Sequence, residues 1–120
     1  MTIAALVIGI TACVAIVVIG LRFLLTPARA MTDFGVAADS LRAMSAAKGV
    51  RDITSGVVPL VVWAAAGRNA LGWTLVAAAL TPIGDAVIVV RNGGKLSTAL
   101  TIHGLTAAVL VVVGLVLALA

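Results

Sequence analysis

Long uninterrupted apolar runs dominate this chain and restrict what it can fold into. Four runs cover residues 3–25, 47–66, 70–90 and 96–120, each close to the roughly 20 residues that cross a bilayer as a helix. Of the 120 residues, 63% are hydrophobic and 10% are charged, whereas soluble domains are about 45–50% apolar and about 25% charged. We therefore predict an all-α fold, a four-helix transmembrane bundle that forms one integral membrane domain over residues 1–120.

Turn signals separate the four runs. Proline at position 27 predicts the end of the first helix, because proline lacks a backbone donor and disfavours helix at the preceding residue. Residues 67–69 read Gly-Arg-Asn and residues 91–95 read Arg-Asn-Gly-Gly-Lys, and both patterns are typical of tight polar turns. We expect helices to end at these three places.

The first connection, residues 26–46, has helical periodicity of its own. From Thr32 onward, apolar residues recur at helical spacing while charged residues take the other faces. The recurring apolar residues are Phe34, Ala38, Leu41 and Met44. This pattern predicts a short amphipathic helix on the cytoplasmic surface. An amino-terminal extension of the second span fits the pattern equally well.

The positive charges predict an orientation. The first and third connections share a side of the membrane and carry seven Lys and Arg, against one in the second connection. The seven are Arg22, Arg29, Arg42, Lys48, Arg51, Arg91 and Lys95, and the one is Arg68. The positive-inside rule then places residues 26–46 and 91–95 in the cytoplasm and both termini outside.

Two processing signals occur near the amino terminus, and we expect neither to be used. Residues 28–30 resemble a signal-peptidase site, and residues 10–13 resemble a lipoprotein box. Both need a positive leader, and no Lys or Arg precedes the first run. Cys13 is then a packing or lipid-facing residue, and a single cysteine excludes an internal disulfide.

The basic residues do not indicate nucleic-acid binding. They stand at the ends of apolar runs, and aromatic residues make up only 3% of the chain, too few for a base-stacking surface. The expected partner is the lipid bilayer, with a lipophilic small molecule as a further candidate and no nucleic acid. Nothing in the sequence requires a cofactor, and a homo-oligomer is left open.

Asp85 is the most informative single residue. It lies within the apolar run 70–90, where a carboxylate costs on the order of 2.5 kcal/mol or more on insertion scales, so a partner is expected. At 1.5 Å per residue, Asp85 lies about 8 Å and His103 about 10 Å inside the cytoplasmic end of its span. Antiparallel packing brings both to the level of the first turns of the second span.

The second span supplies the rest of this cluster. Four polar residues at spacings i, i+3, i+4 and i+7 form a single helix face. They are Lys48, Arg51, Asp52 and Ser55. Lys48 and Asp52 can pair along the helix, which leaves Arg51 to reach Asp85. Pro59 and Pro82 lie within the second and third spans, and each removes a helical donor near the cluster.

We assign candidate roles to these residues. Asp85, His103 and Asp52 are candidate catalytic residues, because histidine beside a carboxylate is the usual composition of a proton-handling pair. Arg51, Lys48 and Ser55 are candidate substrate-binding residues, also predicted from this face. No metal site is expected, since no His or Glu spacing typical of a metal-binding helix is present.

Three functions are compatible with this cluster. The first is a pocket in the cytoplasmic leaflet that binds a lipophilic small molecule or isomerises or cyclises it by acid–base catalysis. The second is a structural or accessory subunit in which an Arg51–Asp85 pair only holds helices together. The third is a proton-coupled transporter component, disfavoured because no polar residues continue beyond Thr74 toward the outer face. Whether the chain is an enzyme stays open.

Two weaker patterns are structural. Trp63 and Trp73 each lie five residues from Arg68 and fit an aromatic belt at the outer interface. Gly104 and Ala108 form a small-residue motif that predicts close helix packing on the fourth span.

With these motifs in view, the chain resembles a family of small four-span membrane proteins classed as a domain of unknown function. The resemblance rests on Lys-Gly-Val-Arg-Asp-Ile at residues 48–53, Pro82-x-x-Asp85, His103-Gly104 and Phe34-Gly35. It implies the four-span fold and emphasises the ionisable residues of the cluster. It implies no established activity.

Overall fold

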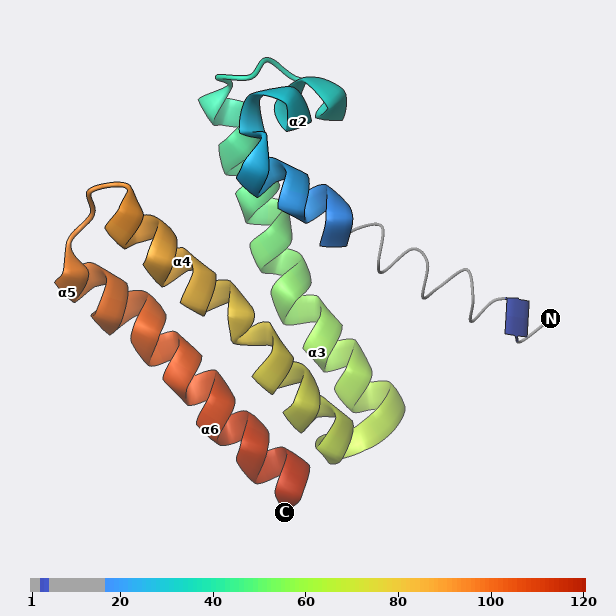
Figure 1. Cartoon of the computed structure of the whole chain (residues 1–120). Coiled ribbons are helices and arrows are strands. Elements are labelled where there is room, and N and C mark those ends of the chain that lie inside the picture. The colour runs from blue at the N-terminus through green and yellow to red at the C-terminus, as the bar shows by residue number, and fades with distance from the viewer. Residues whose placement is uncertain (1–2, 5–16) are drawn as a thin grey trace. The chain divides into compact units, whose positions relative to one another are not determined.

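The structure is a computed structural model that describes residues 3–4 and 17–120. Every regular element in these described ranges is helical, which confirms the all-α prediction for them (Figure 1). Cys13 and most of the first apolar run lie outside the described residues. The chain forms two compact units, Met1–Gly49 and Val50–Ala120.

In the amino-terminal unit, the first described helix covers residues 17–25, and the chain bends at Thr26. Helix α2, Pro27–Phe34, begins at the proline. Proline is favoured in the first turn of a helix because its fixed φ is helical and its missing N–H would have no partner there. The predicted helix end at this proline is therefore confirmed.

Two side-chain contacts hold α2 against the helix of residues 17–25. The guanidinium of Arg22 donates to the carboxylate of Asp33. The rings of Phe23 and Phe34 meet edge to face, with centroids 6.1 Å apart and planes at 75°. Such a ring pair contributes about 0.5–1.5 kcal/mol, and an exposed ion pair contributes about 0–1 kcal/mol. Both contacts therefore contribute modestly to holding α2 in place.

The prediction of one short helix from Thr32 through Met44 is wrong. Helix α2 ends at Gly35, which adopts a left-handed conformation with φ of 103° and donates to the carbonyls of Met31 and Thr32. Glycine adopts this conformation at little cost, so it ends the helix in spite of the apolar periodicity. A short helix does lie in the first connection, but it precedes this glycine. Leu41 and Met44 instead belong to α3, as in the extension alternative.

Helix α3, Leu41–Ala78, passes through the boundary between the units and contains one non-helical residue. Gly67 has φ of 82° and ψ of −172°, a backbone conformation that residues with a Cβ avoid. The turn predicted at residues 67–69 therefore occurs at its first residue. We call residues 41–66 the first arm of α3 and residues 68–78 the second arm.

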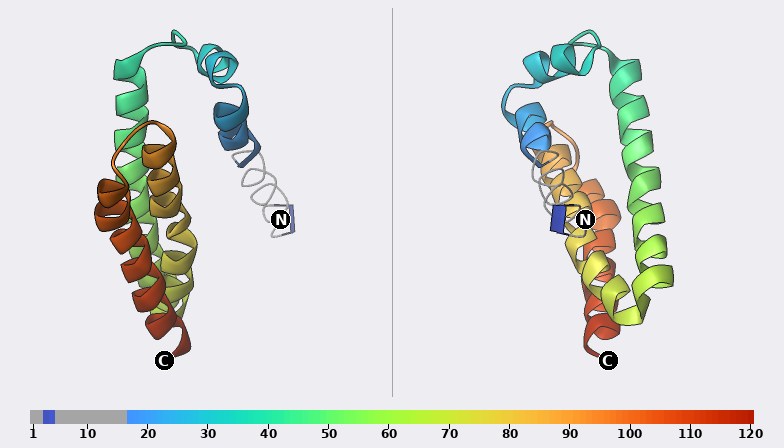
Figure 2. Two further views of the ribbon diagram at one scale, coloured as in Figure 1. Left: turned by 60° about the vertical axis from the view of Figure 1, so that its left-hand side comes forward. Right: turned by 90° about the vertical axis from the view of Figure 1, so that its right-hand side faces the viewer.

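The remaining helices form a hairpin in the carboxy-terminal unit. Helix α4 covers Leu80–Arg91, and a turn at residues 92–95 confirms the second predicted turn. The chain then returns through α5, Leu96–Thr98, the π-helical segment η1, Ala99–Gly104, and α6, Leu105–Leu119. Figures 1 and 2 show α4 side by side with the returning helices, and the contacts of α4 with η1 and α6 agree.

Small residues make the core of the carboxy-terminal unit. Among the described residues of this unit, every buried hydrophobic residue is an alanine. These alanines are Ala79, Ala99, Ala107 and Ala118. Large apolar side chains face outward instead, for example Leu100 at 59% and Val112 at 61% exposure. The helices therefore approach closely, and their large side chains surround the unit.

The closest approach joins the second arm of α3 to α6. A Cβ on Gly72 would lie 2.4 Å from the backbone nitrogen of Ala118, and a Cβ on Gly114 would lie 2.8 Å from the carbonyl oxygen of Gly72. The small-residue motif predicted at Gly104 and Ala108 is not the packing site. A Cβ on Gly104 would meet only atoms of η1 itself, and Ala108 is exposed.

We expect Gly72→Ala to lower the free energy of unfolding by about 1–3 kcal/mol, because the added methyl group forces two backbones apart. Gly56→Ala is the matched control, since a Cβ on Gly56 would meet nothing within 4 Å and alanine is the better helix former. Denaturation of the detergent-purified protein measures both. Equal stability of the two variants would contradict the close contact.

Candidate functional site

An ion pair joins the first arm of α3 to α4. One terminal nitrogen of Arg51, Nη2, donates to both carboxylate oxygens of Asp85, at 3.3 Å to Oδ1 and 3.1 Å to Oδ2. The side chain of Asp85 is 17% exposed and that of Arg51 is 43% exposed. The pair predicted from the sequence is therefore present, with its carboxylate in the more enclosed position.

The same guanidinium also contacts the neighbouring carboxylate. Nη2 and Nε of Arg51 donate to Oδ1 of Asp52 at 3.2 and 3.4 Å. Asp52 is 49% exposed, so this second contact is the more solvated one. Arg51 consequently lies between two carboxylates, one on its own helix and one on α4.

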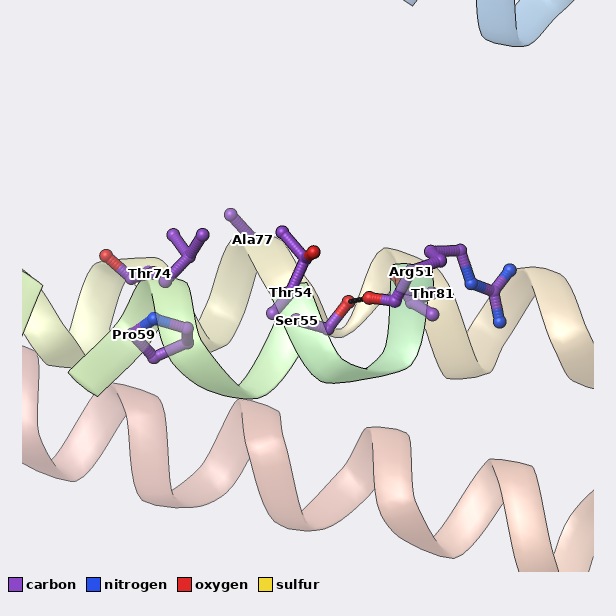
Figure 3. A pocket seen from close by; sticks show the side chains of 9 residues that line it. Arg51, Thr54, Ser55, Pro59, Thr74, Ala77 and Thr81 are labelled. Carbon is purple, nitrogen blue, oxygen red and sulfur yellow. Dashed lines mark hydrogen bonds between the residues drawn. The ribbon is translucent and has the colours of Figure 1, made fainter. Parts of the chain in front are cut away.

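A pocket of about 430 Å³ adjoins this ion pair (Figure 3). It is open at the surface and lies between the first arm of α3 and the stretch that joins the second arm to α4. Its lining residues are Arg51, Thr54, Ser55, Val58, Pro59, Thr74, Ala77, Ala78 and Thr81. Arg51 and Thr81 lie at one end in Figure 3, and Pro59 and Thr74 lie toward the other.

Helical periodicity explains why these residues share a pocket. The residues from the first arm have spacings i, i+3, i+4, i+7 and i+8 from Arg51, which define one helix face. The residues from the other wall have spacings i, i+3, i+4 and i+7 from Thr74. One helix face of the first arm therefore forms one wall, and residues of the second arm together with Thr81 of α4 form the other.

The hydroxyl groups of the pocket differ in their partners. Ser55 donates to the carbonyl of Arg51 at 2.9 Å, and Thr74 donates to the carbonyl of Ala70 at 2.8 Å. The hydroxyls of Thr54 and Thr81 make no hydrogen bond to any other described residue. Two donors therefore remain available on the pocket walls.

Two prolines add acceptors to the same walls. Pro59 and Pro82 have no N–H, so the carbonyls of Ser55 and Ala78, four residues earlier, lack their usual helical donors. Ser55 and Ala78 both line the pocket. The helix is also interrupted at Ala79, between α3 and α4. Pro59 itself lines the pocket, and Pro82 directly follows the lining residue Thr81.

The structure brings together part of the predicted cluster. Arg51, Asp52 and Asp85 are in direct contact, and Ser55 lines the adjoining pocket. Lys48 belongs to the amino-terminal unit and is not one of the residues that line the pocket. The catalytic and binding roles assigned from the sequence stay predictions.

His103 lies apart from these contacts. It is half-buried within η1, and its side chain makes no hydrogen bond or ion pair with another described residue. It also does not line the pocket. π-Helical turns are rare and occur frequently at functional sites, so this residue remains a candidate. Proton exchange with Asp85 stays a prediction.

Sequence reasoning missed two hydroxyl-bearing residues of the pocket, Thr54 and Thr81, and considered Thr74 only as the outermost polar residue of its span. The two missed residues each continue a helix face that contains a charged residue already singled out: Thr54 follows Arg51 by three residues, and Thr81 precedes Asp85 by four. Extending those faces by one turn would have found them. Among the described residues, no three His, Cys, Asp or Glu side chains come together to hold a metal ion.

A family model described as a domain of unknown function, DUF4267, matches residues 13–117. The chain belongs to that family. The match includes both walls of the pocket and the Arg51–Asp85 pair. The predicted membership in a family of unknown function is confirmed. No curated protein and no solved structure matches the chain.

We expect Arg51→Met to lower the free energy of unfolding by about 1–3 kcal/mol, because it leaves the enclosed Asp85 carboxylate without its guanidinium. The same substitution in an Asp85→Asn background should cost clearly less, since the stranded charge is gone. Chemical denaturation in detergent of wild type, the two single variants and the double variant gives the coupling energy between Arg51 and Asp85.

A second double-mutant cycle, which combines Arg51→Met with Asp52→Asn, is the control. Asp52 is half exposed, so its coupling to Arg51 should be smaller than that of Asp85. Additive effects of Arg51→Met and Asp85→Asn would contradict a stabilising pair.

Proposed function

We propose that this chain is an integral membrane protein that crosses the bilayer four times. Two helical stretches, Leu41–Arg91 and Leu96–Leu119, are long and apolar enough to cross a membrane, and Gly67 divides the first into two. The outward-facing large apolar side chains support this proposal, because a water-soluble monomer rarely exposes such extensive apolar surface. The remaining proposed span, residues 3–25, is the first apolar run.

The proposed orientation follows the charges. Residues 26–46 and 91–95 carry most of the Lys and Arg and would face the cytoplasm, with both termini outside. Helix α2 would then lie at the cytoplasmic surface. The exposed Trp63 and Trp73, on either side of the Gly67 break, would lie at the outer interface, where tryptophan is enriched.

We propose that the protein binds a lipophilic small molecule in the pocket between the first arm of α3 and the stretch that joins the second arm to α4. One observation carries this proposal: an open pocket has largely apolar walls and a polar end formed by Arg51. Ligand pockets typically measure about 300–1,000 Å³ and combine apolar walls with a few placed polar groups. A ligand dissolved in the bilayer could enter such a pocket sideways.

Binding is a simpler proposal than catalysis for this geometry. Acid–base isomerisation or cyclisation needs a proton donor and acceptor that both reach the ligand. Asp85 contacts Arg51, but neither Asp85 nor His103 is among the residues that line the pocket. We therefore propose ligand binding as the primary function.

The second candidate function is structural. The Arg51–Asp85 pair links α3 to α4, and in an apolar surrounding such a link would hold the helices in register. This candidate accounts for the ion pair but gives no role to the pocket beside it.

We expect Ala77→Phe to abolish ligand binding, because the ring fills the pocket from its exposed rim. The probe is a hexadecyl compound with a photoreactive diazirine, applied to the protein in phosphatidylcholine nanodiscs. Wild type should show saturable labelling at pocket residues, located by peptide mass spectrometry, and Ala77→Phe should lose at least about tenfold of it.

Ala108→Phe is the matched control, since Ala108 is exposed on α6 and lines no described pocket. It should label like wild type. Two results would favour the structural candidate. One is labelling that excess unlabelled compound does not reduce, and the other is unchanged labelling of the Ala77→Phe protein.

We expect a reporter fused after Ala120 to lie outside the cytoplasm, since the charge asymmetry places both termini there. Alkaline phosphatase fused at this point should be active and a fluorescent cytoplasmic reporter dark. Fusions at residues 91–95 should give the opposite pattern. A bright cytoplasmic reporter after Ala120 would refute the orientation.

A further inference from the structure

We propose that the pocket takes an uncharged lipophile whose head group is a hydroxyl, with an elongated apolar tail. This inference rests on the proposed binding function and specifies its ligand class. Three features of the pocket support it: the state of its guanidinium, the hydrogen-bonding groups of its walls, and its shape.

The guanidinium of Arg51 is already engaged by two carboxylates. Its guanidinium donates to Asp85 from Nη2 and to Asp52 from Nη2 and Nε. A phosphate or carboxylate on the ligand would have to displace one of these carboxylates or accept their repulsion, which is strong in an apolar surrounding. The cluster therefore disfavours the anionic ligand that an isolated arginine would attract.

The walls offer both donors and acceptors. The hydroxyls of Thr54 and Thr81 have no partner among the described residues, and the carbonyls of Ser55 and Ala78 lack their usual helical donors. A hydroxyl head both donates and accepts, so it can use both kinds of group. A carboxylate can only accept, and a quaternary ammonium can do neither.

The pocket has the shape of a short trough. Its first-arm wall runs from Arg51 to Pro59, about 12 Å at 1.5 Å per residue. Val58, Ala77 and Ala78 supply apolar surface along it, while Arg51 and Thr81 lie at one end (Figure 3). A head group at that end would leave an unbranched tail along the trough.

Competition among ligands with one tail tests the head group directly. Unlabelled hexadecanol, hexadecyl phosphate and hexadecyltrimethylammonium compete with the diazirine probe on wild-type protein in phosphatidylcholine nanodiscs. We expect hexadecanol to displace the probe from the pocket at a concentration at least about tenfold lower than either charged compound. Displacement by hexadecyl phosphate at an equal or lower concentration would overturn the inference and leave the binding function standing.

Near-isosteric substitutions test the wall groups. Thr54→Val and Thr81→Val remove the available hydroxyls, and their combination should weaken hexadecanol competition about tenfold or more. Thr106→Val on α6 is the matched control, because Thr106 lines none of the described pockets and its hydroxyl donates to the carbonyl of Ile102. It should change competition less than about twofold. Unchanged competition in the Thr54→Val/Thr81→Val protein would overturn the inference.

The failure of the binding function has a different signature. If none of the three competitors reduces labelling and Ala77→Phe labels like wild type, the pocket binds no hexadecyl compound, and this inference falls together with the proposed function. If hexadecanol competes no better than the charged compounds on wild-type protein, but Ala77→Phe still abolishes labelling, only the assignment of the head group is wrong.

Discussion

The outward orientation of the large apolar side chains is the constraint on which the rest of the structure depends. Because leucine, valine and isoleucine face away from the carboxy-terminal unit, its interior is left to alanine, glycine and proline. Helices with such small contact residues can approach until their backbones touch, as they do where Gly72 meets Gly114 and Ala118. Close backbone packing thus replaces the interlocking of large side chains.

With so few large side chains between the helices, the few polar contacts are the other interactions that join them. Arg51 joins α3 to α4 through Asp85, and the two prolines near it leave carbonyls without helical donors. The same residues that interrupt regular packing also border the pocket. The pocket is therefore a consequence of how these two helices meet, with the ion pair at one end and apolar walls beyond it.

Where local chemistry decides the backbone, the sequence was a good guide. Pro27, Gly67 and the turn at residues 92–95 interrupt the helices as predicted, since proline and glycine act through their own φ and hydrogen-bonding limits. The error in the first connection has the same origin. Apolar periodicity favoured a helix across Gly35, but the left-handed conformation of that glycine ended it.

The sequence by itself determined the helical segments, their apolar character and the pairing of Arg51 with Asp85, because each follows from residue type and spacing along one chain. Only the tertiary structure decided that His103 lies outside the pocket and that Thr54 and Thr81 line it. These outcomes depend on how each helix is rotated about its axis against its neighbours. That rotation is set by backbone contacts such as Gly72 on Gly114, which no single-helix pattern specifies.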